Sequence, residues 1–196
     1  MDDYKITTKN ELAAAISLDE QANLGGKKLS AGMKFRDSFP VEVVRLLHAL
    51  RRLEYALSQK ESTENPLAKA VLSQKIKLFD RHLNTHSHKL NIYLIPFHTA
   101  PGTRICHQNV ILNGKSAQGC IFHGDNVLGN KTAGDKLSVP ILGKNVEVGI
   151  GAKIIGKIYI ADDCKIGAGA VVTKSFETPG TVIVGVPAKA AQKENK

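Results

Sequence analysis

Aromatic residues are scarce in this sequence: tryptophan is absent, and the aromatic share of the 196 residues is 5%. Few aromatic side chains are therefore present to stack against nucleic-acid bases, and no nucleic-acid-binding motif accompanies the basic residues. No apolar run approaches the length that crosses a bilayer. The first residues, Met1-Asp2-Asp3-Tyr4-Lys5, are acidic and polar where a secretory signal has a basic start and an apolar run. We therefore expect a cytoplasmic protein with neither a membrane span nor a nucleic-acid partner.

Cysteine is rare as well. Cys106, Cys120 and Cys164 form no CxxC pair and are odd in number, so the sequence excludes a disulfide framework and predicts reduced thiols. Positive charge, by contrast, is in excess, with a formal net charge of +9. Such an excess favours anionic partners, namely nucleic acid, an anionic lipid surface or a phosphate-rich small molecule, and it also serves solubility.

What the sequence does have is a six-residue rhythm. A branched aliphatic residue occupies every sixth position at Leu142, Val148, Ile154, Ile160, Ile166 and Val172. A second register, four residues later, is mostly small or aliphatic and holds Val146, Ala152, Ile158, Cys164, Ala170 and Phe176. Period six fits neither a helix nor a strand. Three such blocks complete one coil of a triangular solenoid, whose inward side chains stack into an apolar column. We predict a left-handed parallel β-helix.

This rhythm divides the chain into parts. We assign residues 96–190 to the β-helix, 37–95 to a helical domain, 1–36 to an N-terminal extension and 191–196 to a polar tail, so the fold class is α+β. The hexads are ragged between Ile105 and Leu128 and stop at residues 130–138. That polar, turn-rich stretch is predicted to project as a loop, and insertions in solenoids usually lie at a binding face.

Helical periodicity predicts three helices before the coils. The first spans Lys9 to Leu24, with Leu12, Ile16 and Leu24 inward, and stops at Gly25-Gly26. The second starts at Phe39 behind a cap at Asp37 or Ser38, and it buries Leu46, Leu47, Leu50, Leu53 and Leu57. The third is capped by Asn65 and ends near Asn84, and its predicted inner face is Leu67, Val71, Leu72, Phe79 and Leu83.

The opposite faces of these helices are basic and carry Arg51, Arg52, Lys69, Lys75, Lys77 and Arg81. We expect a solvated surface there. Residues 85–98 are predicted to be a loop between the helices and the coils. It contains His86, His88 and His98, but their spacing is irregular and no carboxylate or thiol lies at ligand spacing, so no metal is expected.

Several segments of the coil region resemble a known family. They are Pro101-Gly102-Thr103-Arg104-Ile105-Cys106-His107, Val110-Ile111-Leu112-Asn113, Ile121-Phe122-His123, Pro140-Ile141-Leu142-Gly143-Lys144-Asn145-Val146, Gly167-Ala168-Gly169-Ala170-Val171-Val172-Thr173-Lys174-Ser175 and Gly185-Val186-Pro187-Ala188-Lys189. In this order they are similar to the serine acetyltransferase family of hexapeptide-repeat acyltransferases, especially its short members associated with surface-polysaccharide genes. The similarity covers roughly residues 45 to 190.

The resemblance implies a homotrimer with active sites between adjacent β-helices, and possible pairing of two trimers into a hexamer. It implies transfer of an acetyl group from acetyl-CoA to a hydroxyl, most directly that of L-serine, which gives O-acetylserine for cysteine biosynthesis. His107 matches the catalytic base of the family, and a neutral imidazole suits that task at cytoplasmic pH. His123 matches a second histidine that orients substrate or stabilises the oxyanion, or else has a structural role.

The sequence also departs from the family. Biosynthetic members place an aspartate directly before the histidine, where this chain has Cys106, and residues 91–98 contain no acid that could orient His107. In the loop, Lys136-Leu137-Ser138 replaces the family's Arg-His pair. A sugar hydroxyl, or another small alcohol or amine, therefore gains weight as the acceptor, with Cys106, Asp125 and Asp135 as candidate acceptor contacts.

For acetyl-CoA, the resemblance points to a groove of small residues made by Ala152, Gly167, Ala168, Gly169 and Ala170, with Lys174 and Lys189 as phosphate contacts. Two alternatives stay open. A zinc hydratase on the same fold needs three converging histidines, and His107 and His123 are sixteen residues apart across a ragged coil. A trimeric scaffold could instead bind nucleic acid or anionic membrane through its basic helices.

Overall fold

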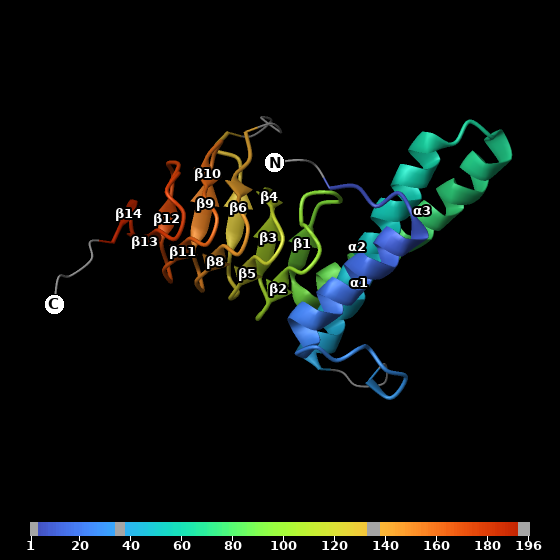
Figure 1. Cartoon of the computed structure of the whole chain (residues 1–196), viewed down its shortest axis with the longest axis horizontal. Coiled ribbons are helices and arrows are strands. Elements are labelled where there is room, and N and C mark those ends of the chain that lie inside the picture. The colour runs from blue at the N-terminus through green and yellow to red at the C-terminus, as the bar shows by residue number, and fades with distance from the viewer. Residues whose placement is uncertain (1–3, 34–37, 133–137, 192–196) are drawn as a thin grey trace.

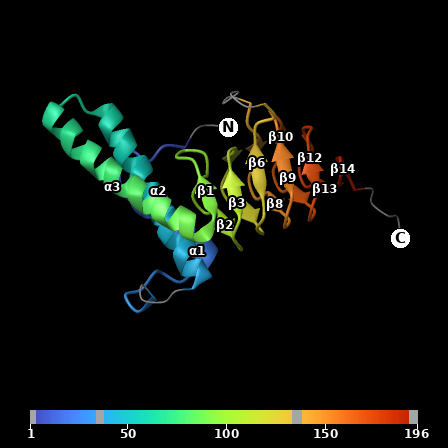
Figure 2. The ribbon, with the colours of Figure 1, turned by 180° about the vertical axis from the view of Figure 1, so that it is seen from behind.

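The structure, a computed structural model, describes residues 4–33, 38–132 and 138–191. Three helices form one end of an elongated molecule and a stack of short strands forms the other (Figure 1). The view from behind shows the strands of one sheet side by side along the stack (Figure 2). No helix in the described ranges is both long enough and apolar enough to cross a membrane.

Helix α1 (Lys9–Leu24) begins and ends where the sequence predicts. Thr8 and Glu11 form a reciprocal capping box at its start, and Gly25 closes it in the left-handed conformation. The prediction of its inner face is wrong, however. Leu12, Ile16 and Leu24 are only half-buried, whereas Ala15, Asp19 and Glu20 are buried. This helix thus turns two carboxylates toward the rest of the molecule.

Helices α2 (Phe39–Ser62) and α3 (Pro66–Leu90) form an antiparallel hairpin. The predicted leucines of α2 are buried or half-buried, and the Asn65 side chain caps α3 by accepting from two backbone N–H groups. Two predictions for α3 are wrong. Leu67 and Val71 are exposed, because the first turns lie at the tip of the hairpin, far from the coils (Figure 1). The helix also continues to Leu90.

The extension of α3 changes the environment of the histidines predicted to lie in a loop. His86 and His88 are on α3, and the His86 Nδ1 atom lies 3.0 Å from a carboxylate oxygen of Glu42 on α2. Glu42 also pairs with Arg45 and, at 3.4 Å, with Lys89. These contacts fasten the base of the hairpin.

The prediction for Arg51 is wrong. The sequence places this residue on a solvated basic face, but its side chain is 0% exposed. Its guanidinium donates to Asp19 of α1 at 2.8 Å, to Glu54 at 3.0 Å and to the Thr99 carbonyl at 2.7 Å. The Tyr4 hydroxyl accepts from Arg51 at 2.6 Å and lies within hydrogen-bond distance of the same Glu54 and the same carbonyl, to one of which it donates its single proton. Because a buried charge is costly unless it is paired and hydrogen-bonded, this cluster ties three separate segments to the first coil.

The strands follow the helices in chain order as β1 (Ile92–Leu94), β2 (Arg104–Ile105), β3 (Val110–Leu112), β4 (Lys115–Ser116), β5 (Ile121–Phe122), β6 (Val127–Gly129), β7 (Ile141–Leu142), β8 (Glu147–Val148), β9 (Lys153–Ile155), β10 (Tyr159–Ile160), β11 (Lys165–Ile166), β12 (Val171–Val172), β13 (Val182–Gly185) and β14 (Ala188–Ala190). They form three sheets in the orders β1-β3-β6-β9-β12, β4-β7-β10 and β2-β5-β8-β11-β13-β14. All pairs are parallel except β13 with β14. This is the predicted β-helix, and the α+β class is confirmed.

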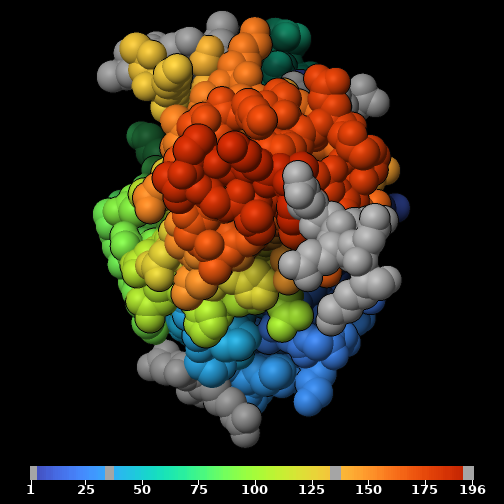
Figure 3. Space-filling view, turned by 90° about the vertical axis from the view of Figure 1, so that its left-hand side faces the viewer, coloured from blue at the N-terminus to red at the C-terminus, as the bar shows by residue number. Residues whose placement is uncertain are grey.

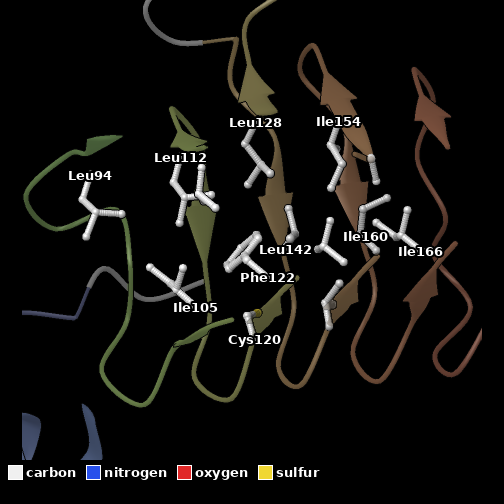
Figure 4. Close-up of a cluster of buried hydrophobic side chains, with 14 of the residues drawn as sticks. Leu94, Ile105, Leu112, Cys120, Phe122, Leu128, Leu142, Ile154, Ile160 and Ile166 are labelled. Atoms are coloured by element: carbon white, nitrogen blue, oxygen red, sulfur yellow. The ribbon is translucent and has the colours of Figure 1, made fainter. Parts of the chain in front are cut away.

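The predicted inward registers are confirmed at every position, because all twelve hexad residues are buried. Figure 4 shows Leu94, Leu112, Leu128 and Ile154 stacked in a row, one from each coil. Each such aliphatic side chain contributes about 1.5–3 kcal/mol when removed from water. No coil could bury this face alone, so neighbouring coils stabilise one another.

Coil length explains why the rhythm is ragged at first. Leu142 pairs with Ile160, eighteen residues on, whereas Leu112 pairs with Leu128, sixteen residues on. Phe122 pairs with Val148, twenty-six residues on, because residues 130–140 lie between β6 and β7. Most of the loop predicted there, residues 133–137, lies outside the described residues. In the view along the coil axis, the yellow segment after β6 stands out from one corner (Figure 3).

Candidate active site

His107 lies at the corner that follows β2, where the chain turns toward β3. Its ring is exposed and stacks on Phe39, the first residue of α2, with 6.4 Å between ring centroids and 27° between planes. Gly124 occupies the next coil directly beside it. A Cβ at Gly124 would come within 2.7 Å of the His107 Cβ, and the φ of Gly124 is +112°. Glycine is thus required for the two coils to approach here.

His123 lies at the same corner one coil later and has a carboxylate partner. Its Nε2 is 2.8 Å from Glu147 Oε1, and Lys165 Nζ is 3.5 Å from Glu147 Oε2. Glu147 and Lys165 project from β8 and β11, which are neighbours in one sheet. The hydrogen bond from His123 lowers the pKa of the Glu147 carboxyl, burial opposes this, and Lys165 lowers it further.

Both histidines line one surface cavity of about 550 Å³. Its other lining residues are Glu147, Gly149, Ile150, Lys165, Ile166, Gly167, Ala168 and Val182. The cavity therefore runs from the His107 corner along later coils, and it combines two imidazoles, one carboxylate and one ammonium group with a floor of small residues. Such a mixture of apolar walls and a few convergent polar groups is typical of small-molecule sites.

The predicted groove residues fall into three groups. Gly167 and Ala168 line this cavity, and Gly169 is exposed at the corner beside them. Ala152 and Ala170, by contrast, are fully buried in the apolar column, so their methyl groups cannot line a groove on the surface of this chain. Lys174 and Lys189 are exposed, and the Lys174 ammonium lies 5.5 Å from the centroid of the Phe176 ring.

The predicted acceptor contacts lie apart from the cavity lining. Cys106 is half-buried with a free thiol, and its backbone N–H donates to the Phe122 carbonyl. Asp125 accepts a 2.8 Å hydrogen bond from Asn109, which in turn accepts one of 2.7 Å from Asn91. These three residues have positive φ at equivalent corners and form a ladder between coils. Asp135 lies outside the described residues.

Glu147 and Lys165 are the site residues that sequence reasoning missed. Each directly precedes an inward hexad residue, so each projects outward on the same sheet as the strand before His123. The sequence does not show that Glu147 and His123 are neighbours, because the segment between β6 and β7 separates them along the chain. Within the described part of the chain, no three His, Cys, Asp or Glu side chains gather as possible metal ligands.

A second cavity, of about 680 Å³, lies between α1 and the opposite side of the coils. Tyr4, Ile6, Leu18 and Tyr159 are among its lining residues, and neither His107 nor His123 reaches it. The chemistry-bearing groups therefore gather in the smaller cavity.

The repeating coils define the class of protein. The family model for the bacterial transferase hexapeptide (six repeats) matches residues 140–174. Together with the three sheets of stacked short strands, this match identifies the fold as a left-handed β-helix built from hexapeptide repeats.

Within this class, the similarity is to serine acetyltransferases. The serine acetyltransferase of Buchnera aphidicola subsp. Schizaphis graminum is 42% identical over 73 residues, which are 37% of this chain and 28% of the relative. The chain thus matches less than a third of that relative's length. The resemblance predicted from the sequence is confirmed.

Solved structures agree over a longer stretch. A serine acetyltransferase from Brucella abortus strain S19 superimposes with a TM-score of 0.62 at 22% identity, covering 93% of this chain and 70% of the other. A serine acetyltransferase in complex with CoA gives a TM-score of 0.61 at 18% identity, covering 93% and 71%. At these identities the agreement establishes the fold, helices included.

Proposed function

We propose that this protein transfers an acetyl group from acetyl-CoA to the hydroxyl of a small acceptor, with L-serine as the first candidate. The observation that carries the proposal is the single cavity in which His107 and His123 lie beside Gly167 and Ala168, on coils of the hexapeptide-transferase type. The names of the relatives, and a neighbour solved with CoA, support both the reaction and the donor.

Transfer of an acetyl group to a hydroxyl requires a base that takes the proton of the hydroxyl. An alcohol is a poor nucleophile because its pKa lies far above 7, so the neutral His107 imidazole takes its proton as the oxygen attacks the thioester carbonyl carbon. The carbon–sulfur bond then breaks, and the imidazolium returns the proton to the departing thiolate. His107 is suited to this role because its ring is exposed at the rim of the cavity.

The donor is proposed to lie along the coils. Gly167, Ala168 and Gly169 leave room for the pantetheine arm to pass close to the backbone. Lys174 and Lys189 are exposed on the C-terminal coils and supply positive charge for the phosphates. Ala152 and Ala170 do not contact the donor in this proposal, since both are buried. Their small side chains allow the walls of the coil to lie close together.

A sugar hydroxyl is the second candidate acceptor. Cys106 stands where biosynthetic serine acetyltransferases have an aspartate, and the carboxylate found in the cavity, Glu147, bonds to His123 instead of His107. The groups at the acceptor end of this cavity therefore differ from those of the biosynthetic serine acetyltransferases. Asp135 remains a candidate acceptor contact.

The experiment is release of free CoA from acetyl-CoA by the purified protein, with L-serine, a panel of sugars and amino alcohols, and no acceptor in parallel. His107→Ala is the matched variant. Turnover that requires serine and disappears in the variant supports the first acceptor. If serine is inert and a sugar reacts, the proposed roles of His107 as the base and acetyl-CoA as the donor still hold, and the assignment of serine as the acceptor is wrong. Salt-dependent retention on heparin without acetyl-CoA binding would instead favour the scaffold.

We further propose a homotrimer, with the option of a hexamer, located in the cytoplasm. The free thiols of Cys106, Cys120 and Cys164 suit a reducing compartment. The apolar outer surface of one sheet, discussed below, supports association between copies of the chain.

A further inference from the structure

We propose that Glu147 is a positioning residue that fixes the proton of the neutral His123 ring on Nε2, so that Nδ1 is left as the hydrogen-bond acceptor of this second histidine. The inference rests on the proposed function for its catalytic meaning. The bond itself is a property of the free protein and is tested separately.

The geometry places Glu147 between two partners. Glu147 faces Ile121 on β5 and Lys165 on β11 in the sheet register, and His123 directly follows β5. Its Oε1 lies 2.8 Å from His123 Nε2, and its Oε2 lies 3.5 Å from Lys165 Nζ. One carboxylate oxygen is thus directed to the ring while the ammonium group restrains the other.

The ionised carboxylate determines the tautomer. A carboxylate can only accept hydrogen bonds, so the 2.8 Å contact requires that Nε2 carries the proton. A neutral ring has one donor and one acceptor nitrogen, and Nδ1 is therefore left with its lone pair. The low pKa of Glu147 keeps the carboxylate ionised across the range in which an imidazole is neutral.

This assignment separates the two roles predicted for His123. A neutral ring with its Nε2 proton bound to Glu147 has no free N–H for an oxyanion, so it cannot stabilise one as a donor. It can instead accept a hydrogen bond from the hydroxyl or amine of the acceptor. We thus assign His123 to acceptor binding, with His107 as the base.

The pair is poorly suited to a purely structural role. The His123 and Glu147 side chains are 39% and 36% exposed, and ion pairs with such access to solvent contribute little to stability. The other titratable groups lining the cavity are His107 and Lys165, and Arg104 lies on β2, two strands from Glu147. Asp125 follows His123 by two residues, but it does not line the cavity, and its carboxylate accepts from Asn109. Among the described residues that line the cavity, Glu147 is therefore the one carboxylate.

The first test uses the ¹⁵N chemical shifts of the ring nitrogens in histidine-labelled protein near pH 8, without substrate. His123→Asn identifies the signal among the seven histidines. In the wild type we expect the Nε2–H tautomer of His123, and in Glu147→Ala a mixture of both tautomers. Glu177→Ala, which removes an exposed carboxylate elsewhere, should leave the signal unchanged. The Nδ1–H form in the wild type, or an unchanged spectrum in Glu147→Ala, would overturn the inference.

The second test concerns turnover with whichever acceptor the wild type uses. We expect Glu147→Ala to raise the KM for the acceptor or lower kcat at least about tenfold, since a positioned hydrogen bond to the acceptor is lost. The KM for acetyl-CoA and the thermal unfolding should match those of Glu177→Ala. Unchanged acceptor kinetics would refute the catalytic meaning. If the wild type turns over no acceptor, the proposed function fails, while the ring nitrogens still report whether Glu147 positions His123.

Discussion

At the scale of single residues, Gly124 determines how closely the His107 coil and the His123 coil approach. An added Cβ would meet the His107 Cβ at 2.7 Å and the Gln108 carbonyl at 3.3 Å, on a backbone with φ of +112°. Neither neighbour is the far end of a flexible side chain. Any larger residue must therefore displace the backbone that carries the proposed base.

We expect Gly124→Ala to cost about 2–4 kcal/mol of unfolding free energy, from backbone strain together with overpacking. Release of CoA should fall by at least tenfold, because a displacement of about 1 Å can cost a hundredfold in rate. Denaturant titration and the turnover assay measure both effects. Gly180→Ala is the control, since Gly180 also has positive φ, +69°, but has no atom within 4 Å of an added Cβ. Equal losses in both variants would contradict this explanation.

At the scale of elements, side chains of α1 form hydrogen bonds with the backbone of the segment that leads to His107. Asn23 donates from its amide to the Thr103 carbonyl at 2.9 Å and accepts from the Ile105 N–H at 3.1 Å. It therefore satisfies the outer edge of β2 much as a neighbouring strand would. One turn earlier, Asp19 accepts from the Gly102 N–H at 2.8 Å. The same helix thus binds three backbone groups, of Gly102, Thr103 and Ile105, on the approach to His107.

We expect Asn23→Ala to destabilise the protein by about 1–3 kcal/mol, since the Thr103 carbonyl and the Ile105 N–H lose their partner. Amide hydrogen exchange at Ile105 should quicken, and turnover should fall while His123 keeps its tautomer. Asn10→Ala, at an exposed position near the start of the same helix, is the matched control. Unchanged exchange at Ile105 would show that α1 does not hold this strand.

The α2–α3 hairpin depends on a carboxylate and therefore on pH. Burial raises the pKa of Glu42, but His86, Arg45 and Lys89 outweigh it, so the folded-state pKa lies below the ordinary value. A group with a lowered pKa stabilises the fold above its unfolded pKa, near 4.3, and that contribution is lost as pH falls through the lower folded value.

We expect Glu42→Gln to cost about 1.5–3 kcal/mol at pH 7, the range for hydrogen bonds to charged groups. The difference between wild type and variant should begin to shrink as pH falls below the unfolded pKa, about 4.3, and should vanish only once pH has passed the lower folded pKa. Denaturant titrations at pH 7 and pH 3.5 measure both values. A difference that stays constant with pH would indicate that the charge of Glu42 is not what fastens the hairpin.

At the scale of the molecule, the coils were predictable from sequence because their period is local. Each hexad residue is buried by its own equivalents in the coils before and after it, so the pattern alone identified the column. The buried state of Arg51 was not predictable, since its partners Asp19 and the Thr99 carbonyl are 32 and 48 residues away. Glu147 was missed for a similar reason, as the inserted loop separates it from His123. Pairings across long sequence separations leave no periodic signal.

The strands of the β1-β3-β6-β9-β12 sheet lie side by side in Figure 2, and the outward-facing residues of this sheet are mostly apolar. Tyr93, Ile111, Val127 and Val171 occupy one row of the register, which Lys153 interrupts. Tyr93 and Ile111 are 44% and 42% exposed in the single chain. An apolar row of this kind on a rigid sheet favours association with another copy of the chain.

We therefore expect Ile111→Glu to dissociate the proposed trimer, since the substitution places an unpaired charge in a contact between apolar faces. Light scattering after size exclusion should give the mass of a single 21.2 kDa chain for the variant and three times that for the wild type. Turnover should be lost with dissociation if the sites lie between subunits. Tyr159→Glu, an equally exposed residue on the β4-β7-β10 sheet, is the control and should remain trimeric. Dissociation by Tyr159→Glu instead would place the contact on that other sheet.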